Sequence, residues 1–154
     1  MEDKEALLRR VTPVAVLKAI TPESKNAISG HCLGNEVIGI WNFPFRVGRE
    51  SRVEHLDGVM VHSERVKISP GKPNNDIYLI DNRQYLEISR QHIKIEKVDS
   101  GYLLVDRGSA CGTIVNNQKI GSEDTGGSFE LKDGDIIKIG SENSPYEFMF
   151  ITFD

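Results

Sequence analysis

The sequence predicts an all-β protein, an antiparallel sandwich of about ten or eleven short strands, and three observations carry this prediction. Apolar and β-branched residues come in runs about one strand long, and several of these alternate with polar residues. Turn residues, among them 14 glycines and 6 prolines, separate the runs at fairly regular intervals. No long stretch with helical periodicity lies between the runs, which disfavours a parallel doubly wound sheet.

The predicted strands follow one another along the chain after a short N-terminal segment. They span residues 14–20, 36–40, 43–47, 76–80, 92–96, 102–106, 113–115, 118–120, 129–131, 135–139 and 146–153. In the fifth run, Ile93 and Ile95 alternate with two charged residues, so one face is expected on a core and the other in water. Short turns at 116–117 and 132–134 predict two tight hairpins.

The first residues are expected to lie outside the sandwich. Residues 1–13 are interpreted as a tail or a short helix, because Pro13 stops any helix that starts earlier. The sandwich domain is then expected to cover residues 14–154, a length that can enclose a core of its own.

Two connections are longer than a sandwich of this kind requires. The longer is an insertion at about residues 50–75, which holds four basic and four acidic residues and so does not form a simple basic cradle. The shorter runs from residue 81 to 88. Long connections in compact domains are often functional, so the insertion is either a tolerated surface segment or part of a partner contact.

Composition excludes several function classes. The chain has 19 basic and 23 acidic residues and a formal charge of −4, which disfavours non-specific binding to nucleic acid. No apolar run approaches the roughly 20 residues needed to span a bilayer, so no membrane partner is expected. The acidic N-terminus lacks the apolar stretch of an export signal, which predicts a cytoplasmic protein, or a nuclear one if the source is eukaryotic. Cys32 and Cys111 are accordingly expected to be reduced, although they could in principle pair.

Enzymatic and metal-binding interpretations find little support. Ser89 and His92 lie three residues apart at the start of a predicted strand, which does not favour the direct bond of a nucleophile and its base. Cys111 near Arg107 leaves open a thiol with a lowered pKa, but no histidine base is assignable to it. The histidines and cysteines match no zinc spacing, and no nucleotide-binding glycine motif is present. We therefore expect no enzyme, no metal and no cofactor.

A set of residues at strand ends is more coherent. Gly48-Arg49 ends one predicted strand, Ser89-Arg90-x-His92 precedes another, and Gly112 precedes a third. In this order, with core strands between the parts, the chain resembles the forkhead-associated (FHA) domain, a β-sandwich that binds phosphothreonine peptides. The resemblance runs from about residue 14 to residue 153.

The resemblance assigns the phosphate contacts to three residues. Arg49 is implied as the principal phosphate ligand, Ser89 as a hydroxyl donor and Arg90 as a further contact on the phosphate side. The chemistry is consistent, because a phosphate presents three acceptor oxygens and up to two negative charges, and a guanidinium offers paired, charge-assisted hydrogen bonds.

Other positions are implied as supports of the site. Gly48 would allow a tight approach of the chain, His92 would brace its loop from within, and Gly112 and Thr113 would hold the third loop. The resemblance also places Thr113 and Asn116 among the peptide-binding residues.

The sequence departs from the family at the third loop. Cys111 stands where the family has an asparagine that hydrogen-bonds the peptide backbone, and Ala110 lacks a hydroxyl that some members offer to the phosphate. Glu87 lies where the family selects the third peptide residue after the phosphothreonine, which predicts a basic or neutral residue there. The phosphate anchor is thus intact and the backbone anchor weakened.

Two functions follow from this pattern. The first is a non-catalytic adaptor that binds a threonine-phosphorylated protein downstream of a serine/threonine kinase. The alternative is a phosphorylation-independent interaction or assembly module with a degenerate phosphate site. The two are distinguished by whether Arg49 and Ser89 face one pocket or are covered by residues 50–75. The oligomeric state is not predicted.

Overall fold

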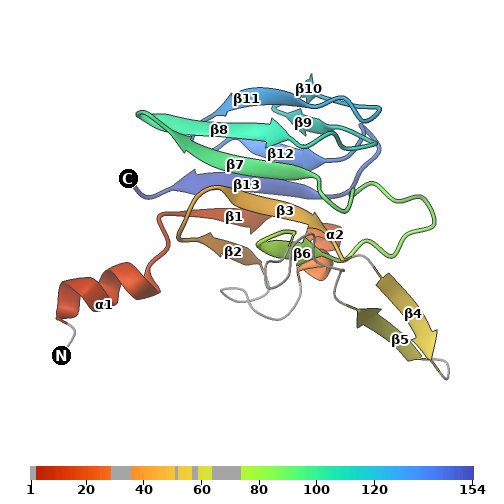
Figure 1. The fold of residues 1–154 in the computed structure, drawn as a ribbon, viewed down its shortest axis with the longest axis horizontal. Helices are drawn as coiled ribbons and strands as arrows, with labels where there is room; N and C mark the ends of the chain where they lie inside the picture. The colour runs from red at the N-terminus through yellow and green to blue at the C-terminus, as the bar shows by residue number, and fades with distance from the viewer. Residues whose placement is uncertain (1–2, 29–35, 51, 57–58, 64–73) are drawn as a thin grey trace.

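Two β-sheets stacked face to face form the body of the protein (Figure 1). The computed structural model describes residues 3–28, 36–50 and 74–154, together with the backbone of 52–56 and 59–63. The first sheet has six strands and the second has five, so the predicted sandwich of about ten or eleven short strands is confirmed.

The six-stranded sheet is antiparallel throughout and has the order β10-β9-β12-β13-β1-β2. Its strands are β1 (Ala15–Ala19), β2 (Val37–Ile40), β9 (Thr113–Val115), β10 (Gln118–Ile120), β12 (Ile136–Ile139) and β13 (Glu147–Thr152). The predicted hairpin at Asn116-Asn117 joins β9 to β10, and both asparagines have positive φ.

The five-stranded sheet has the order β11-β8-β7-β3-β6. Its strands are β3 (Phe45–Arg49), β6 (Ile77–Leu79), β7 (Ile93–Val98), β8 (Gly101–Asp106) and β11 (Gly127–Leu131). One pair corrects the expectation of a purely antiparallel sandwich, because β6 runs parallel to β3 with Val47 opposite Ile77. A parallel neighbour requires a long crossover, and the chain between β3 and β6 supplies it.

The core lies between the two sheets and follows the alternation of the strands. Ile93 and Ile95 on β7 are fully buried, as predicted, and their neighbours Lys94 and Glu96 are partly exposed. Phe148 and Phe150 on β13 enter the same core from the opposite sheet. Burial of side chains of this size stabilises the fold by about 1.5–3 kcal/mol each.

Two helices flank the sandwich. The helix α1 (Lys4–Val11) has Asp3 as its N-cap, buries no residue and projects from the body in Figure 1, which agrees with the expected short helix. The helix α2 (Pro22–Ala27) was not predicted, because no element was expected between the strands at 14–20 and 36–40. Proline suits the first turn of a helix, and the Thr21 side chain caps this turn by accepting from the Ser24 N–H.

The predicted insertion at 50–75 contains a β-hairpin of β4 (Arg52–Leu56) and β5 (Val59–Ser63). Within the described residues these strands pair only with each other, and in Figure 1 the hairpin extends away from the sandwich. The sequence analysis expected a long connection there and gave it no strands.

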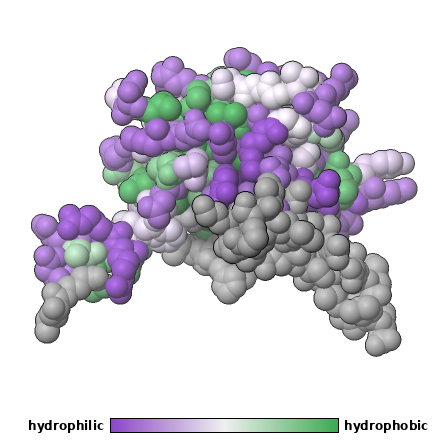
Figure 2. All heavy atoms as spheres, in the orientation of Figure 1, coloured by the Kyte–Doolittle hydropathy of each residue, from purple (hydrophilic) through white to green (hydrophobic). Residues whose placement is uncertain are grey.

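The surface of the sandwich is mixed in character. Hydrophilic residues, purple in Figure 2, dominate the visible face, and apolar residues appear on it in small groups. In the described part of the chain, no helix is long and apolar enough to cross a membrane.

Candidate functional site

Three connections meet at one end of the sandwich and form a shallow pocket. The strand β3 ends there at Arg49, β7 begins there, and β8 leads through residues 107–112 into β9; the register places Val47 opposite Ile93 and Ile93 opposite Asp106. The pocket has a volume of about 410 Å³ and is lined by Arg49, Ser89, Arg90, Gln91, Arg107, Gly108, Ala110 and Asp124. The structure therefore brings together the three residues that the resemblance assigned to phosphate.

Arg49 is held at the pocket by its own strand and by the β6–β7 connection. Its backbone N–H donates to the Ser89 carbonyl at 3.0 Å, and its side-chain Nε donates to the Ile88 carbonyl at 2.8 Å. Burial, together with the charge of Arg90, lowers the pKa of Arg49, while Asp81 opposes this shift. An arginine stays protonated despite such shifts, so a partly desolvated positive charge faces the pocket.

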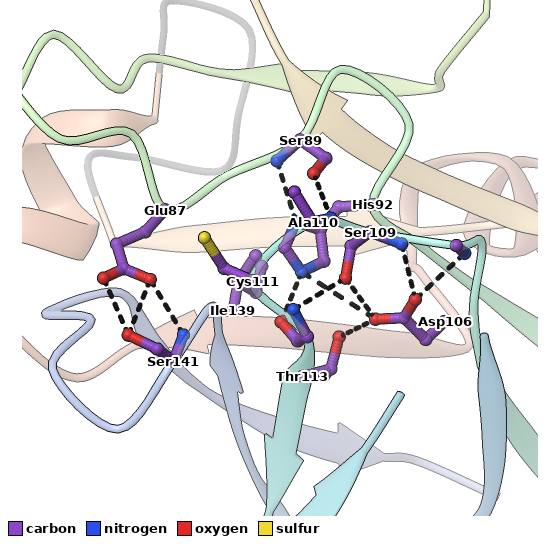
Figure 3. Close-up of polar contacts among 12 residues, drawn as sticks. Glu87, Ser89, His92, Asp106, Ser109, Ala110, Cys111, Thr113, Ile139 and Ser141 are labelled. Atoms are coloured by element: carbon purple, nitrogen blue, oxygen red, sulfur yellow. Dashed lines mark hydrogen bonds and ion pairs between the residues drawn. The ribbon is translucent and has the colours of Figure 1, made fainter. Parts of the chain in front are cut away.

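Ser89 is oriented by two hydrogen bonds. Its backbone N–H donates to His92 Nδ1 at 2.9 Å, and its Oγ accepts the Ala110 N–H at 3.0 Å (Figure 3). Because the oxygen accepts in this contact, the hydroxyl proton remains available to an acceptor in the pocket.

His92 acts as a neutral brace between two loops. The ring is fully buried; Nδ1 accepts from Ser89, and Nε2 lies 2.7 Å from the Gly112 carbonyl, which fixes the tautomer with the proton on Nε2. Burial lowers the pKa of His92, although the Gly112 carbonyl and the Asp106 and Glu87 charges oppose the shift. The nearest Asp106 oxygen is 4.0 Å away, so the carbonyl is the partner of Nε2.

A buried carboxylate organises the β8–β9 loop beneath the pocket. Asp106 accepts four hydrogen bonds, from the N–H groups of Gly108 and Ser109 and from the hydroxyls of Ser109 and Thr113 (Figure 3). From the sequence, Asp106 was expected only as the end of a strand, with no further role. A signal was available, because glycine and serine follow two and three residues after this aspartate, which is typical of a turn bonded by the aspartate side chain.

Both glycines named from the sequence are required by close contacts. A Cβ at Gly48 would overlap the Arg90 carbonyl, so the strand can pass this loop only without a side chain. Gly112 has φ +82°, and a Cβ there would overlap the Gly121 carbonyl. These two positions allow the three loops to come together.

Thr113 and Asn116 do not line the pocket, although the resemblance placed them among the peptide contacts. Thr113 is fully buried with its hydroxyl on Asp106, so it supports the loop from below. Asn116 lies at the far end of β9, where its amide donates to Asp135 and accepts the Ile136 N–H. These contacts tie the β9–β10 turn to the start of β12.

Glu87 and Cys111 lie side by side next to the pocket (Figure 3). The Glu87 carboxylate accepts from the N–H and hydroxyl of Ser141, at 2.8 Å each, in the β12–β13 connection. Cys111 is a free thiol whose sulfur lies 3.5 Å from the Leu86 carbonyl, and burial followed by the Glu87 charge raises its pKa. A nearby Arg107 would have lowered this pKa, so the raised pKa means that the Cys111 thiol is not activated. Cys32 lies outside the described residues.

Two charged residues of the pocket lining were not expected from the sequence. Arg107 follows β8, and Asp124 lies in the β10–β11 connection. Arg107 was considered only as a neighbour of the thiol. The lining of the pocket thus includes three arginines and one aspartate.

The fold and this pocket define a β-sandwich with a cationic site among the loops at one end. Residues 45–140 match the FHA-domain family, and the chain belongs to that family.

An FHA domain-containing protein of Arabidopsis thaliana is 37% identical over 57 residues, which make up 37% of this chain and 14% of that protein. Among solved structures, the FHA domain of an Arabidopsis thaliana hypothetical protein matches with a TM-score of 0.55 and 22% identity, over 94% of this chain and 89% of that one. EmbR of Mycobacterium tuberculosis, in complex with a low-affinity phosphopeptide, matches with a TM-score of 0.52 and 21% identity, over 91% of this chain and 24% of that one. Identities this low in the two structures show the fold alone.

Proposed function

We propose that this FHA domain binds threonine-phosphorylated segments of a partner protein, with the phosphate held by Arg49, Ser89 and Arg90. The observation that carries the proposal is that a guanidinium and a hydroxyl from separate strand ends line one pocket. Both are fixed by hydrogen bonds to the scaffold and both keep donors for a ligand. Charge-assisted hydrogen bonds of this kind contribute about 1.5–3 kcal/mol each.

The charge of the pocket favours a phosphate over a carboxylate. Three arginines and one aspartate line it, while the chain as a whole carries a formal charge of −4. A local cationic pocket on an acidic protein attracts a small dianion and repels long polyanions, which supports a phosphopeptide and not nucleic acid as the ligand. The phosphopeptide in the EmbR complex supports the same choice.

The proposed role is that of an adaptor without catalytic activity. It requires a serine/threonine kinase upstream, because the ligand exists only after phosphorylation, and it fits a cytoplasmic setting where such kinases and reduced thiols occur. The Cys111 thiol, whose pKa is raised, offers no activated nucleophile. No membrane partner and no cofactor enter the proposal.

A second candidate function is a phosphorylation-independent assembly module. One observation favours it: Cys111 stands in place of the amide that would hold the peptide backbone, and its sulfur faces the Leu86 carbonyl. In that case the interaction would use another surface, and the phosphate site would be silent.

Titration calorimetry with a phosphothreonine peptide library separates the two candidates. We expect binding by the wild type, and at least a tenfold loss for Arg49→Ala and for dephosphorylated peptides. The matched control is Arg9→Ala, which removes the same charge from the exposed helix α1 and should leave affinity unchanged. Equal binding by Arg49→Ala, or of phosphorylated and unphosphorylated peptides, contradicts the first proposal and favours the second.

A further inference from the structure

Arg107 is fixed at the pocket by several hydrogen bonds. Its backbone N–H donates to the His92 carbonyl at 2.8 Å. Its guanidinium donates from Nη1 to Asn75 Oδ1 at 2.7 Å, and from Nη2 to Gln91 Oε1 at 3.0 Å and the Asn74 carbonyl at 3.3 Å. These contacts orient the guanidinium at the pocket.

Two of the three residues that accept from the Arg107 guanidinium are buried. Asn74 and Asn75 are almost fully buried, and the Asn75 amide also donates to the Arg90 carbonyl at 2.8 Å. One buried side chain therefore links the Arg107 guanidinium to the backbone of Arg90, which lines the same pocket. Such a prearranged cation loses little conformational entropy when an anion binds.

Arg107 adds a third basic residue to the lining of the pocket. A phosphothreonine carries about −1.5 to −2 at neutral pH. Arg49, Arg90 and Arg107 line the pocket together with one acidic residue, Asp124. This excess of basic residues favours a doubly charged phosphate as the ligand.

We propose that Arg107 is a direct phosphate ligand, a third guanidinium beside Arg49 and Arg90. This inference rests on the proposed function and deepens it. The site lacks two contacts, because Cys111 has no amide for the peptide backbone and Ala110 has no hydroxyl for the phosphate. A phosphate bond from Arg107 compensates for them. Affinity is then determined mainly by the phosphate and less by the peptide sequence around it.

The test compares Arg107→Gln and Arg107→Lys with the wild type and with Arg9→Gln, a control that removes the same charge from the exposed helix α1. Two quantities are measured: the Kd of a phosphothreonine peptide by fluorescence anisotropy, and the inhibition constant of inorganic phosphate against that peptide. Thermal melting reports whether each variant is folded. We expect Arg107→Gln to weaken both the peptide and inorganic phosphate by the same factor, about tenfold or more. Arg107→Lys, which keeps the charge but not the fork of donors, should weaken them by a smaller factor.

Several outcomes overturn the inference. If Arg107→Gln weakens the peptide but leaves the inhibition constant of phosphate unchanged, Arg107 contacts the peptide chain and not the phosphate. If the Lys and Gln variants lose affinity equally, Arg107 acts only through the bonds that hold Asn74, Asn75 and Gln91. If Arg107→Gln binds like the wild type while Arg49→Ala does not, the inference fails and the proposed function stands. If the wild type binds no phosphothreonine peptide, both fail.

Discussion

At the loop end of this sandwich, a buried layer of polar residues lies beneath an outer layer of charged residues, and the two differ in chemistry. The inner layer is buried: Asp106 accepts from the hydroxyls of Ser109 and Thr113, and His92 bonds the backbone of two loops. The outer layer is a group of charged residues around the pocket, of which Arg49 and Arg107 are partly buried and Arg90 and Asp124 are exposed. The inner layer fixes where the loops lie, and the outer layer determines what they can bind. Substitutions in the two layers should therefore separate stability from affinity.

The largest expected effect lies in the inner layer, at Asp106. Asp106→Ala leaves four donors in the β8–β9 loop without their acceptor, two of them hydroxyls in a buried site. Unsatisfied buried groups cost about 1–3 kcal/mol each, and partial relaxation reduces their sum, so we expect a loss of about 3–5 kcal/mol in the free energy of unfolding. Urea denaturation measures this change. A decrease of less than about 1 kcal/mol in the free energy of unfolding would show that Asp106 does not hold the β8–β9 loop.

The next effect is a pH dependence that belongs to the inner layer alone. Because burial lowers the pKa of His92 in the folded protein, the folded ring stays neutral while the unfolded ring takes up a proton below about 6.5. Stability contributed by the neutral ring is thus present above that pH and is lost as the pH falls, by at most about 1.4 kcal/mol per pH unit.

The measurement for His92 is the free energy of unfolding at a series of pH values from about 7.5 down to 5.5, for wild type and His92→Asn. The variant is expected to be less stable at neutral pH and to show a flatter profile across this range. Parallel profiles would mean that His92 is not the group that titrates.

In the outer layer, Cys111→Asn should increase affinity without changing stability much. The resemblance to the family implies that an amide at this position would hydrogen-bond the peptide backbone, which a thiol does poorly. We expect phosphothreonine peptides to bind several-fold more tightly, about threefold to tenfold, as one added hydrogen bond provides. Calorimetry on the wild type and Cys111→Asn measures this gain in affinity, and Cys111→Ala is the control that adds no amide. No gain over Cys111→Ala would mean that the peptide does not pass this position.

The smallest expected effect is at Asp124, where charge changes and shape does not. The residue is exposed with φ +64°, a conformation that asparagine adopts readily, so Asp124→Asn should leave the fold intact. Removing this negative charge from the lining of the pocket should raise phosphopeptide affinity about twofold to fivefold, and the gain should shrink at high salt. A decrease in affinity would mean that Asp124 contacts the peptide instead of opposing its phosphate.

The contrast between the layers also explains how much the sequence could predict. Most strands were predicted because alternation, as at Ile93 and Ile95, is a local signal of the sheet and its core face. Gly48, Arg49 and Ser89 were found because they lie at strand ends in a recognisable order. The parallel position of β6 and the helix α2 were missed, since the first depends on pairing across a long connection and Pro22 is compatible with two local structures.

The residues missed in the site share one property: their roles depend on contacts that are distant in sequence. Arg107 is one of 19 basic residues, and nothing local distinguishes it until Asn75 and Gln91 are seen to orient it. Glu87 was assigned to peptide selection, which stays a prediction, while the contact of its carboxylate with Ser141, 54 residues away along the chain, carried no local signal. Local patterns predict the scaffold of such a site better than they predict its charged surface.

A crystal structure with a bound phosphothreonine peptide tests the central claim most directly. The phosphate is predicted to lie in the pocket, within hydrogen-bond distance of the Arg49 guanidinium and the Ser89 hydroxyl, with the loops below it unchanged. A peptide bound on another face of the sandwich, or a phosphate that touches neither group, would contradict the account.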